Sequence, residues 1–158
     1  MLRALQQEDY KLIGQWASNP FELFRFAADT WQFPVTEASV TEYITKNKNR
    51  YQFIFEQNGI SAGFCELILK DTDTPRLSRI ILGSAFRGRG WGKVMINEML
   101  DKCRELSSLK KVYLYVIESN EAARKCYESC GFVYENEEKL VLHFESQHYP
   151  ILKMSCIL

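Results

Sequence analysis

The feature that most constrains this chain is a glycine-rich turn that leads directly into a long amphipathic helix. The turn spans residues 87–92 (Arg-Gly-Arg-Gly-Trp-Gly), and apolar residues at helical spacing continue from Gly90 to about Leu106. The first N–H groups of a helix have no partner within it, and the helix dipole places partial positive charge at the same end. Glycine also lets a ligand approach the backbone closely. The turn therefore predicts a site that receives an anion such as a phosphate.

Two common nucleotide-binding motifs do not fit this turn. A dinucleotide-binding G-x-G-x-x-G motif would need glycine where Lys93 or Met95 stands. A Walker A loop ending at Gly92 and Lys93 would need glycine in place of Arg87 and serine or threonine in place of Val94. The anion is therefore expected on a different kind of loop, whose N–H groups converge on it.

A second informative segment, residues 120–132, follows an apolar, strand-like run. It reads Asn-Glu-Ala-Ala-Arg-Lys-Cys-Tyr-Glu-Ser-Cys-Gly-Phe. Asn120 is a favourable residue for capping the start of a helix. Tyr127 lies two turns later on the same face, and Gly131 suits the positive φ that commonly follows a helix end. Taken alone, the segment is a short capped helix with an aromatic residue in the core.

Together the two segments resemble motifs A and B of the GCN5-related N-acetyltransferase (GNAT) superfamily, R/Q-x-x-G-x-G/A and N-x-x-A-x-x-x-Y-x-x-x-G-F. Every defined position matches, and the resemblance covers residues 51–132. It implies a GNAT-like fold that binds acetyl-CoA, with the pyrophosphate on the glycine turn and the pantetheine arm along the strand at 80–82. The cofactor-binding residues implied in this way are Ile80, Ile81, Leu82, Arg87, Gly88, Arg89, Gly90, Trp91, Gly92, Lys93, Asn120, Ala123 and Tyr127.

The same resemblance suggests two catalytic residues. In the GNAT pattern the hydroxyl of the motif B tyrosine points at the coenzyme sulfur, so Tyr127 is predicted to act as the general acid toward the departing thiolate. Some N-terminal acetyltransferases of the superfamily carry a glutamate five residues before the motif B asparagine, but this chain has Tyr115 there. Glu66, in the predicted strand 60–70, is the nearest substitute as general base. A solvent-facing structural role for Glu66, with water as the proton acceptor, stays open.

Composition bounds the class of protein. At 158 residues with 46% apolar content, the chain suits a single domain spanning 1–158. Its 20 basic and 20 acidic residues cancel, which disfavours nucleic acid as a partner. Five cysteines without a C-x-x-C pair and only two histidines favour neither a metal site nor a disulfide framework. No apolar run approaches the roughly 18 residues of a membrane span, and we see no signal segment, so a cytoplasmic protein that does not bind membranes is expected.

The order of elements predicts a mixed α/β domain, and the resemblance adds a central, mostly antiparallel, twisted sheet flanked by helices. Asn58-Gly59 is the strongest hairpin signal, and a second hairpin is expected at 71–75. Asp9, Asn19 and Thr36 are predicted to begin three helices. The predicted strands are 2–5, 51–57, 60–70, 76–82, 111–117, 132–134, 140–144 and 149–157.

These observations predict an acetyl-CoA-dependent N-acetyltransferase that transfers the acetyl group directly to a primary amine in a ternary complex. The amine can belong to a small molecule or to a protein N-terminus. The segment 16–34 also resembles the ribosomal-protein N-terminal acetyltransferase branch. The alternative is a non-catalytic acyl-CoA-binding sensor with the same fold, which the intact Tyr127 argues against. A monomer and a homodimer are both compatible with the sequence.

Overall fold

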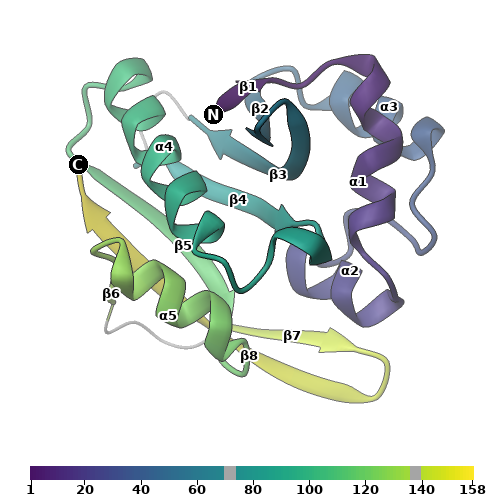
Figure 1. Cartoon of the computed structure of the whole chain (residues 1–158). Coiled ribbons are helices and arrows are strands. Elements are labelled where there is room, and N and C mark those ends of the chain that lie inside the picture. The colour runs from purple at the N-terminus through teal and green to yellow at the C-terminus, as the bar shows by residue number, and fades with distance from the viewer. Residues whose placement is uncertain (70–73, 136–139) are drawn as a thin grey trace.

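The computed structural model describes residues 1–69, 74–135 and 140–158. Within these ranges the chain forms five α-helices packed on an eight-stranded sheet (Figure 1). The strands are β1 (Leu2–Ala4), β2 (Arg50–Gln57), β3 (Ile60–Ile68), β4 (Arg76–Leu82), β5 (Lys111–Ile117), β6 (Val133–Tyr134), β7 (Leu140–Phe144) and β8 (Gln147–Ile157). The helices are α1 (Tyr10–Trp16), α2 (Pro20–Ala27), α3 (Glu37–Lys46), α4 (Trp91–Leu106) and α5 (Glu121–Ser129), with short 3-10 turns η1 (Gln7–Asp9) and η2 (Ser84–Phe86). The predicted mixed α/β fold is confirmed.

The sheet opens between its two middle strands. Its strand order is β1-β2-β3-β4-β5-β8-β6, with β7 paired to β8, and all described pairs are antiparallel except β4 with β5. That parallel pair is registered only where Arg76 lies opposite Tyr113, near the start of both strands. Within the described residues, β4 and β5 make no further ladder beyond this point. The two strands therefore separate toward their C-terminal ends.

A β-bulge in β4 coincides with this separation. The register between β3 and β4 shifts between Phe64 and Glu66, so that Arg79 and Ile80 of β4 lie opposite a single residue of β3. Arg79 adopts a φ of 48°, a left-handed conformation that is rare outside glycine. A bulge bends its strand and increases the local twist. The bulge therefore lies in the part of β4 that separates from β5.

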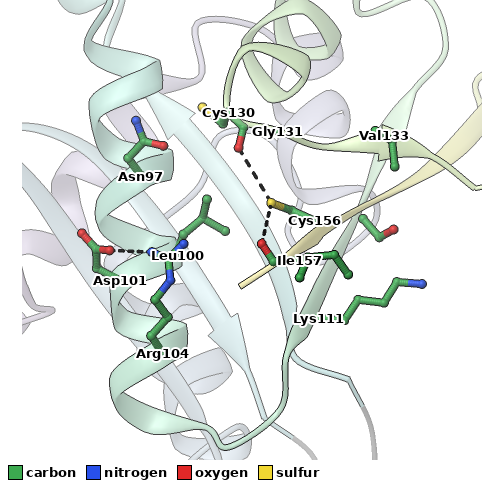
Figure 2. A pocket seen from close by; sticks show the side chains of 11 residues that line it. Asn97, Leu100, Asp101, Arg104, Lys111, Cys130, Gly131, Val133, Cys156 and Ile157 are labelled. Atoms are coloured by element: carbon green, nitrogen blue, oxygen red, sulfur yellow. Dashed lines mark hydrogen bonds and ion pairs between the residues drawn. The ribbon is translucent and has the colours of Figure 1, made fainter.

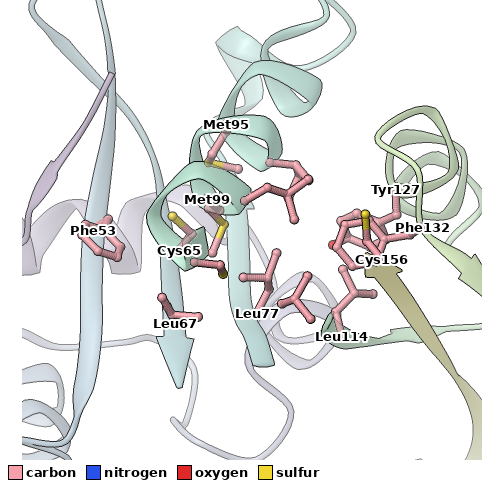
Figure 3. Close-up of a cluster of buried hydrophobic side chains, with 14 of the residues drawn as sticks. Phe53, Cys65, Leu67, Leu77, Met95, Met99, Leu114, Tyr127, Phe132 and Cys156 are labelled. Atoms are coloured by element: carbon pink, nitrogen blue, oxygen red, sulfur yellow. The ribbon is translucent and has the colours of Figure 1, made fainter. Parts of the chain in front are cut away.

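Helices cover both faces of the sheet with two separate apolar layers. On one face, α4 buries Met95 and Met99 against Leu77 of β4 and neighbouring strands, as Figure 3 shows. On the other face, α1, α2 and α3 bury a second cluster that includes Ile13 and Phe64. The apolar stripe predicted for the helix after the glycine turn is therefore the one that packs on the sheet.

Most of the predicted turns and caps are confirmed. Asn58 and Gly59 both have positive φ in the turn between β2 and β3. The Asn19 side chain accepts a hydrogen bond from the Glu22 N–H, and Thr36 accepts one from the Ser39 N–H. The expected hairpin at 71–75 falls largely on residues 71–73, outside the described part of the chain.

Asp9 stands at the N-cap position of α1, where that helix was predicted to begin, but the side-chain cap is absent. Asp9 lies at the end of η1, and its side chain caps no N–H of α1. Its carboxylate instead accepts the N–H of Gln6 and forms an ion pair with Arg3 at 2.7 Å. The sequence at Asp9 does not reveal this arrangement, because Arg3 is brought to it by the pairing of β1 with β2.

The described residues were compared with what a membrane-spanning helix and a metal site require. None of the helices in 1–69, 74–135 and 140–158 is long and apolar enough to cross a membrane. Over the same ranges, no group of three or more histidine, cysteine, aspartate or glutamate side chains is placed to hold a metal ion. The five cysteines are free thiols.

Candidate functional site

A cavity of about 790 Å³ lies where β4 and β5 separate. Its walls come from β4, from the glycine turn with the start of α4, from α5, and from α2 with the segment that follows it. Leu142 of β7 and Ile151 of β8 line it as well. The predicted cofactor-binding residues that line this cavity are Ile80, Ile81, Leu82, Arg87, Gly88, Gly90, Gly92, Lys93, Asn120, Ala123 and Tyr127. Residues predicted from separate motifs are therefore brought together around one space.

Three predicted site residues do not line the cavity. Arg89 lies on the exposed turn, and the Trp91 side chain packs against the apolar cluster beneath α4. Glu66 is fully buried in β3. Arg89 and Trp91 belong to the turn, but neither is among the residues that line the cavity.

The edge of β4 supplies backbone groups to the cavity. Ile80 and Leu82 place their side chains against the apolar cluster under α4, so their side chains are largely core. Among the described residues, no strand pairs with β4 on the side of β5 beyond Arg76. An unpaired strand edge can bind an extended ligand that carries amide groups, in the manner of an added strand. The edge next to Ile80 and Leu82 is suited to such a ligand.

The glycine turn has the conformation that its sequence predicts. Gly88 and Gly90 have φ of 71° and 82°, and a Cβ atom on either would meet no atom within 4 Å, so both positions are open to a ligand. Gly90 is the N-cap of α4, and in the described residues no hydrogen bond uses the backbone N–H of Gly90 or Trp91. The free N–H groups and the helix dipole make this turn receptive to an anion.

Gly92 has a different purpose from the other glycines of the turn. A Cβ atom at Gly92 would lie 3.2 Å from the Cys126 sulfur of α5. The absence of a side chain therefore lets α4 and α5 approach each other. Both helices line the same cavity.

Arg87 holds the turn in place rather than presenting a free charge. Its guanidinium donates to the carbonyl of Leu82 at 2.9 Å and of Trp16 at 3.3 Å, and it pairs with Glu22 at 2.8 Å. Hydrogen bonds from Ser18, together with Arg87, lower the pKa of Glu22 to about 2. Arg87 thus ties the turn to β4 and to α2, and Lys93 on the first turn of α4 also lines the cavity.

Tyr127 places a hydroxyl in the cavity. Asn120 caps α5 by accepting the N–H of Ala123 at 3.4 Å, which fixes the start of the helix that carries Tyr127. The Tyr127 residue is 8% exposed, packs near the ring of Phe132, and has no hydrogen-bond partner among the described residues. Burial raises the pKa of the Tyr127 hydroxyl well above its usual range. The hydroxyl is therefore a protonated donor available to a ligand.

The thiol that lines the cavity is not activated. Cys126 borders the cavity next to Gly92. The neighbouring Cys130 thiol and burial both raise the pKa of Cys126. A thiol that stays protonated at neutral pH is a poor nucleophile. The cavity therefore offers no activated cysteine for a covalent intermediate.

Glu66 occupies a buried polar network on the face of the sheet covered by α3. Its Oε1 atom pairs with Arg79 at 2.7 Å and with Arg50 at 3.2 Å. Its Oε2 atom accepts hydrogen bonds from Tyr43 at 2.7 Å and from Gln52 at 3.3 Å. With 0% of Glu66 exposed, the alternative of a solvent-facing strand residue is wrong.

The predicted role of Glu66 as a base in contact with the acceptor is not supported by its position. Both carboxylate oxygens already accept donors, and Glu66 does not line the cavity, whereas its partner Arg79 does. Glu66 alternates with the core residues Cys65 and Leu67, so it lies on the opposite side of β3 from them. This alternation did not predict that Tyr43, Arg50 and Arg79 cover that side.

Several residues on the α2 side of the cavity were not among the predicted site residues. Thr30 and Arg79 line it and bond to each other at 2.9 Å. Phe24 lines it too, and its ring stacks on that of Phe144 in the β7–β8 hairpin with centroids 4.9 Å apart. Aromatic residues are dense between Phe21 and Phe33, which marks this segment as unusual in the sequence. Their aromatic partners on the hairpin are more than a hundred residues away, so the sequence does not reveal the contact.

A second hollow of about 770 Å³ lies behind α4, between its C-terminal half and the ends of β6 and β8 (Figure 2). Asp101 and Arg104 on its rim pair with each other at 2.6 Å. The Cys156 sulfur points at the carbonyl of Cys130 at 3.8 Å. This hollow has neither an open strand edge nor a helix N-terminus, so it does not offer the features that the motifs predict.

Comparisons with known proteins agree with this geometry. A family model described as the acetyltransferase (GNAT) family matches residues 12–132. The spermidine N(1)-acetyltransferase of Vibrio cholerae is 28% identical over 85% of this chain and 79% of its own length. The enzyme with the same name from Escherichia coli strain K12 is 24% identical over 99% of this chain and 84% of its own length.

A solved structure supports the fold. The crystal structure of spermidine N-acetyltransferase from Vibrio cholerae in complex with CoA and spermine superposes with a TM-score of 0.81. The match covers 99% of this chain and 94% of that chain, at 24% sequence identity. The whole described domain therefore shares the arrangement of helices and strands seen in that protein.

Proposed function

The chain belongs to the acetyltransferase (GNAT) family of acetyl-CoA-dependent enzymes, and we propose that it acetylates a primary amine of a small molecule, with polyamines as the acceptor class. The observation that carries this proposal is the cavity between β4 and β5, where an open strand edge, a helix N-terminus and the Tyr127 hydroxyl meet. The polyamine assignment draws on the two relatives that are spermidine acetyltransferases. Those relatives take the place of the ribosomal-protein branch as the guide to the acceptor.

The residues of the cavity fit the successive parts of acetyl-CoA. The N–H groups at the start of α4, opened by Gly88 and Gly90, receive the pyrophosphate. Lys93 adds a positive charge on the first turn of that helix. The edge of β4 next to Ile80 and Leu82 pairs with the amides of the pantetheine arm. This places the thioester at the depth where Tyr127 lines the cavity.

Tyr127 stabilises the leaving group. As the amine nitrogen bonds to the thioester carbon and the carbon–sulfur bond breaks, negative charge develops on the sulfur. The Tyr127 hydroxyl donates a hydrogen bond to that charge and stabilises it as it forms. Because burial raises the pKa of Tyr127, the donor stays protonated across the working pH range.

The amine attacks directly, without an acetylated enzyme. The raised pKa of Cys126 leaves the cavity without an activated thiol, which supports transfer within a ternary complex. We assign the proton of the attacking amine to water, since Glu66 is fully buried and does not itself line the cavity. The rival function, an acyl-CoA sensor without turnover, does not account for a tyrosine that lines the cavity and whose hydroxyl has no partner among the described residues.

The acceptor is tested by measuring CoA release from acetyl-CoA with spermidine, spermine, a monoamine, an aminoglycoside and a peptide with a free N-terminus. We expect the polyamines to give the highest kcat/KM. If the peptide gives a higher kcat/KM than the polyamines, the acceptor is a protein N-terminus, and the acetyl transfer itself is unchanged. Tight binding of acetyl-CoA with no acceleration by any amine would instead support the sensor.

A further inference from the structure

We propose that Glu66 is a positioning residue, which acts through Arg79 to hold the bulge of β4 and with it the strand edge that binds the acyl carrier. The inference rests on the proposed binding of acetyl-CoA along that edge. It assigns Glu66 a place in cofactor binding rather than in proton transfer.

Arg79 is held at both ends of its guanidinium. Its Nη1 atom pairs with Glu66 at 2.7 Å, while Nε and Nη2 donate to the Thr30 hydroxyl at 3.2 and 2.9 Å. The Arg79 side chain is 15% exposed, and both Arg79 and Thr30 line the cavity. The pair with Glu66 therefore links the buried sheet to the cavity wall.

Glu66 is in turn fixed by elements that do not touch the cavity. Tyr43 of α3 and Gln52 of β2 donate to the same carboxylate oxygen, and Arg50 pairs with the other. The Tyr43 ring also lies between two guanidinium groups, 4.9 Å from that of Arg79 and 5.6 Å from that of Arg50. Glu66 is thus a rigid anchor, and Arg79 is the group that it holds.

The backbone conformation of Arg79 is the feature that requires support from surrounding contacts. Its φ of 48° is unfavourable for a side chain with a Cβ atom, and it occurs in the bulge next to Ile80. Such conformations persist when surrounding contacts impose them. The ion pair with Glu66 and the bonds to Thr30 are those contacts.

Loss of this anchor would change the edge of β4. If the backbone at Arg79 relaxes toward an ordinary extended conformation, the bulge shifts, and a one-residue slip turns side chains to the opposite face of the sheet. The backbone N–H and C=O groups next to Ile80 would then no longer be aligned along the edge of β4 that faces β5. Binding of acetyl-CoA would have to restore the bulge, and its affinity would fall accordingly.

The first test compares Arg79→Gly with Arg79→Ala. Both variants remove the guanidinium and leave Glu66 paired with Arg50, but glycine adopts positive φ without steric cost, whereas alanine does not. We expect acetyl-CoA, titrated by calorimetry, to bind the alanine variant about 5- to 30-fold more weakly than the glycine variant. Equal dissociation constants in the two variants would overturn the proposal.

The second test places Glu66→Gln in the parent and in the Arg79→Gly variant. We expect Glu66→Gln to weaken acetyl-CoA binding about tenfold in the parent, and by less than twofold beside Arg79→Gly, because the bulge no longer depends on the ion pair. Glu42→Gln is the control, since it breaks an exposed ion pair with Lys46 on α3. If Glu66→Gln does not fold, the comparison of the two Arg79 variants decides alone.

A general base would give the opposite pattern. Glu66→Gln would then leave the affinity for acetyl-CoA unchanged and remove the acidic limb of kcat. The positioning account predicts a lower affinity with the acidic limb retained, and the reverse result contradicts it. The parent protein in the same titration distinguishes failure of the proposed function from failure of the Glu66 role. If the parent does not bind acetyl-CoA, the proposed function is refuted. If the parent and all variants bind it equally, only the role of Glu66 is refuted.

Discussion

The glycine turn and the bulge of β4 border the same cavity, but they are shaped in different ways. At the turn, positive φ occurs at Gly88 and Gly90, where the residue itself permits the conformation. At the bulge, positive φ occurs at Arg79, where ion pairs and hydrogen bonds impose it. The turn is therefore robust to changes elsewhere in the chain, whereas the bulge depends on the side chains of Glu66 in β3 and of Thr30 after α2.

This difference also separates the two tasks of the cavity. The turn and the start of α4 present backbone N–H groups, which suit the phosphate end of the proposed cofactor. The bulge shapes the strand edge proposed to bind the pantetheine arm, whereas the Tyr127 hydroxyl is proposed to act on the leaving group as the reaction proceeds. Substitutions at the two places should accordingly affect binding and turnover to different extents.

The largest expected effect is at the turn. Gly90→Asp adds a Cβ atom at a φ of 82° and a negative charge beside the expected pyrophosphate. We expect at least a 100-fold loss of acetyl-CoA affinity, about 2.7 kcal/mol, measured by calorimetry. Gly59→Asp is the matched control, since Gly59 has a φ of 75° in the turn between β2 and β3. Unchanged binding by a folded Gly90→Asp variant would show that the site is wrongly placed.

The next effect is on turnover. Tyr127→Phe keeps the buried ring and removes the hydroxyl, so kcat should fall roughly 10- to 1000-fold with little change in the KM for acetyl-CoA. Tyr51→Phe, on the exposed part of β2, should leave both parameters unaltered. If chemistry limits the rate and kcat nevertheless stays the same, Tyr127 has no part in the reaction.

The pH dependence of kcat sharpens the same assignment. Because burial raises the pKa of Tyr127, its hydroxyl remains a proton donor below that raised value and is lost only as the pH rises through it. We therefore expect no alkaline decline of kcat from Tyr127 at or below the usual tyrosine pKa of about 10. An alkaline limb near pH 8 that disappears in Tyr127→Phe would contradict the buried, protonated donor.

A smaller effect is expected where β3 supports the edge of β4. A Cβ atom at Gly63 would lie 2.5 Å from the carbonyl oxygen of Ile81, so Gly63→Ala must displace one strand. We expect the free energy of unfolding to fall by about 1–3 kcal/mol in urea denaturation, together with weaker acetyl-CoA binding. Gly59→Ala strains a turn without a clash and should leave binding unchanged. Full stability in Gly63→Ala would mean that the strands are free to part there.

The smallest effect is expected at the ion pair that ties the turn to α2. Glu22→Gln removes the partner of Arg87, whose guanidinium still donates to the carbonyl of Leu82. Partly exposed pairs contribute at most about 1 kcal/mol, so the affinity for acetyl-CoA should fall no more than about fivefold. Glu105→Gln, which breaks an exposed pair with Lys102, provides the control. A tenfold or greater loss would mean that the turn, like the bulge, depends on distant side chains.

The sequence predicts those parts of the site that depend on residues close together in the chain, and it does not predict those that depend on distant residues. The positive φ of Gly131 and the cap at Asn120 were predictable, since each depends on neighbours within a few residues. The partners of Glu66 were not, because α3, β2 and β4 must first assemble around it. Long-range ion pairs leave no spacing or periodicity in a sequence.

The account's central claim, amine acetylation at the cavity between β4 and β5, is tested most directly by product analysis. The parent protein is incubated with acetyl-CoA and spermidine, and the CoA and acetylated amine are quantified by mass spectrometry beside Tyr127→Phe. We predict equal amounts of the two products, formed at least tenfold more slowly by the variant. Release of CoA without any acetylated amine, or identical yields and rates from both proteins, would contradict the claim.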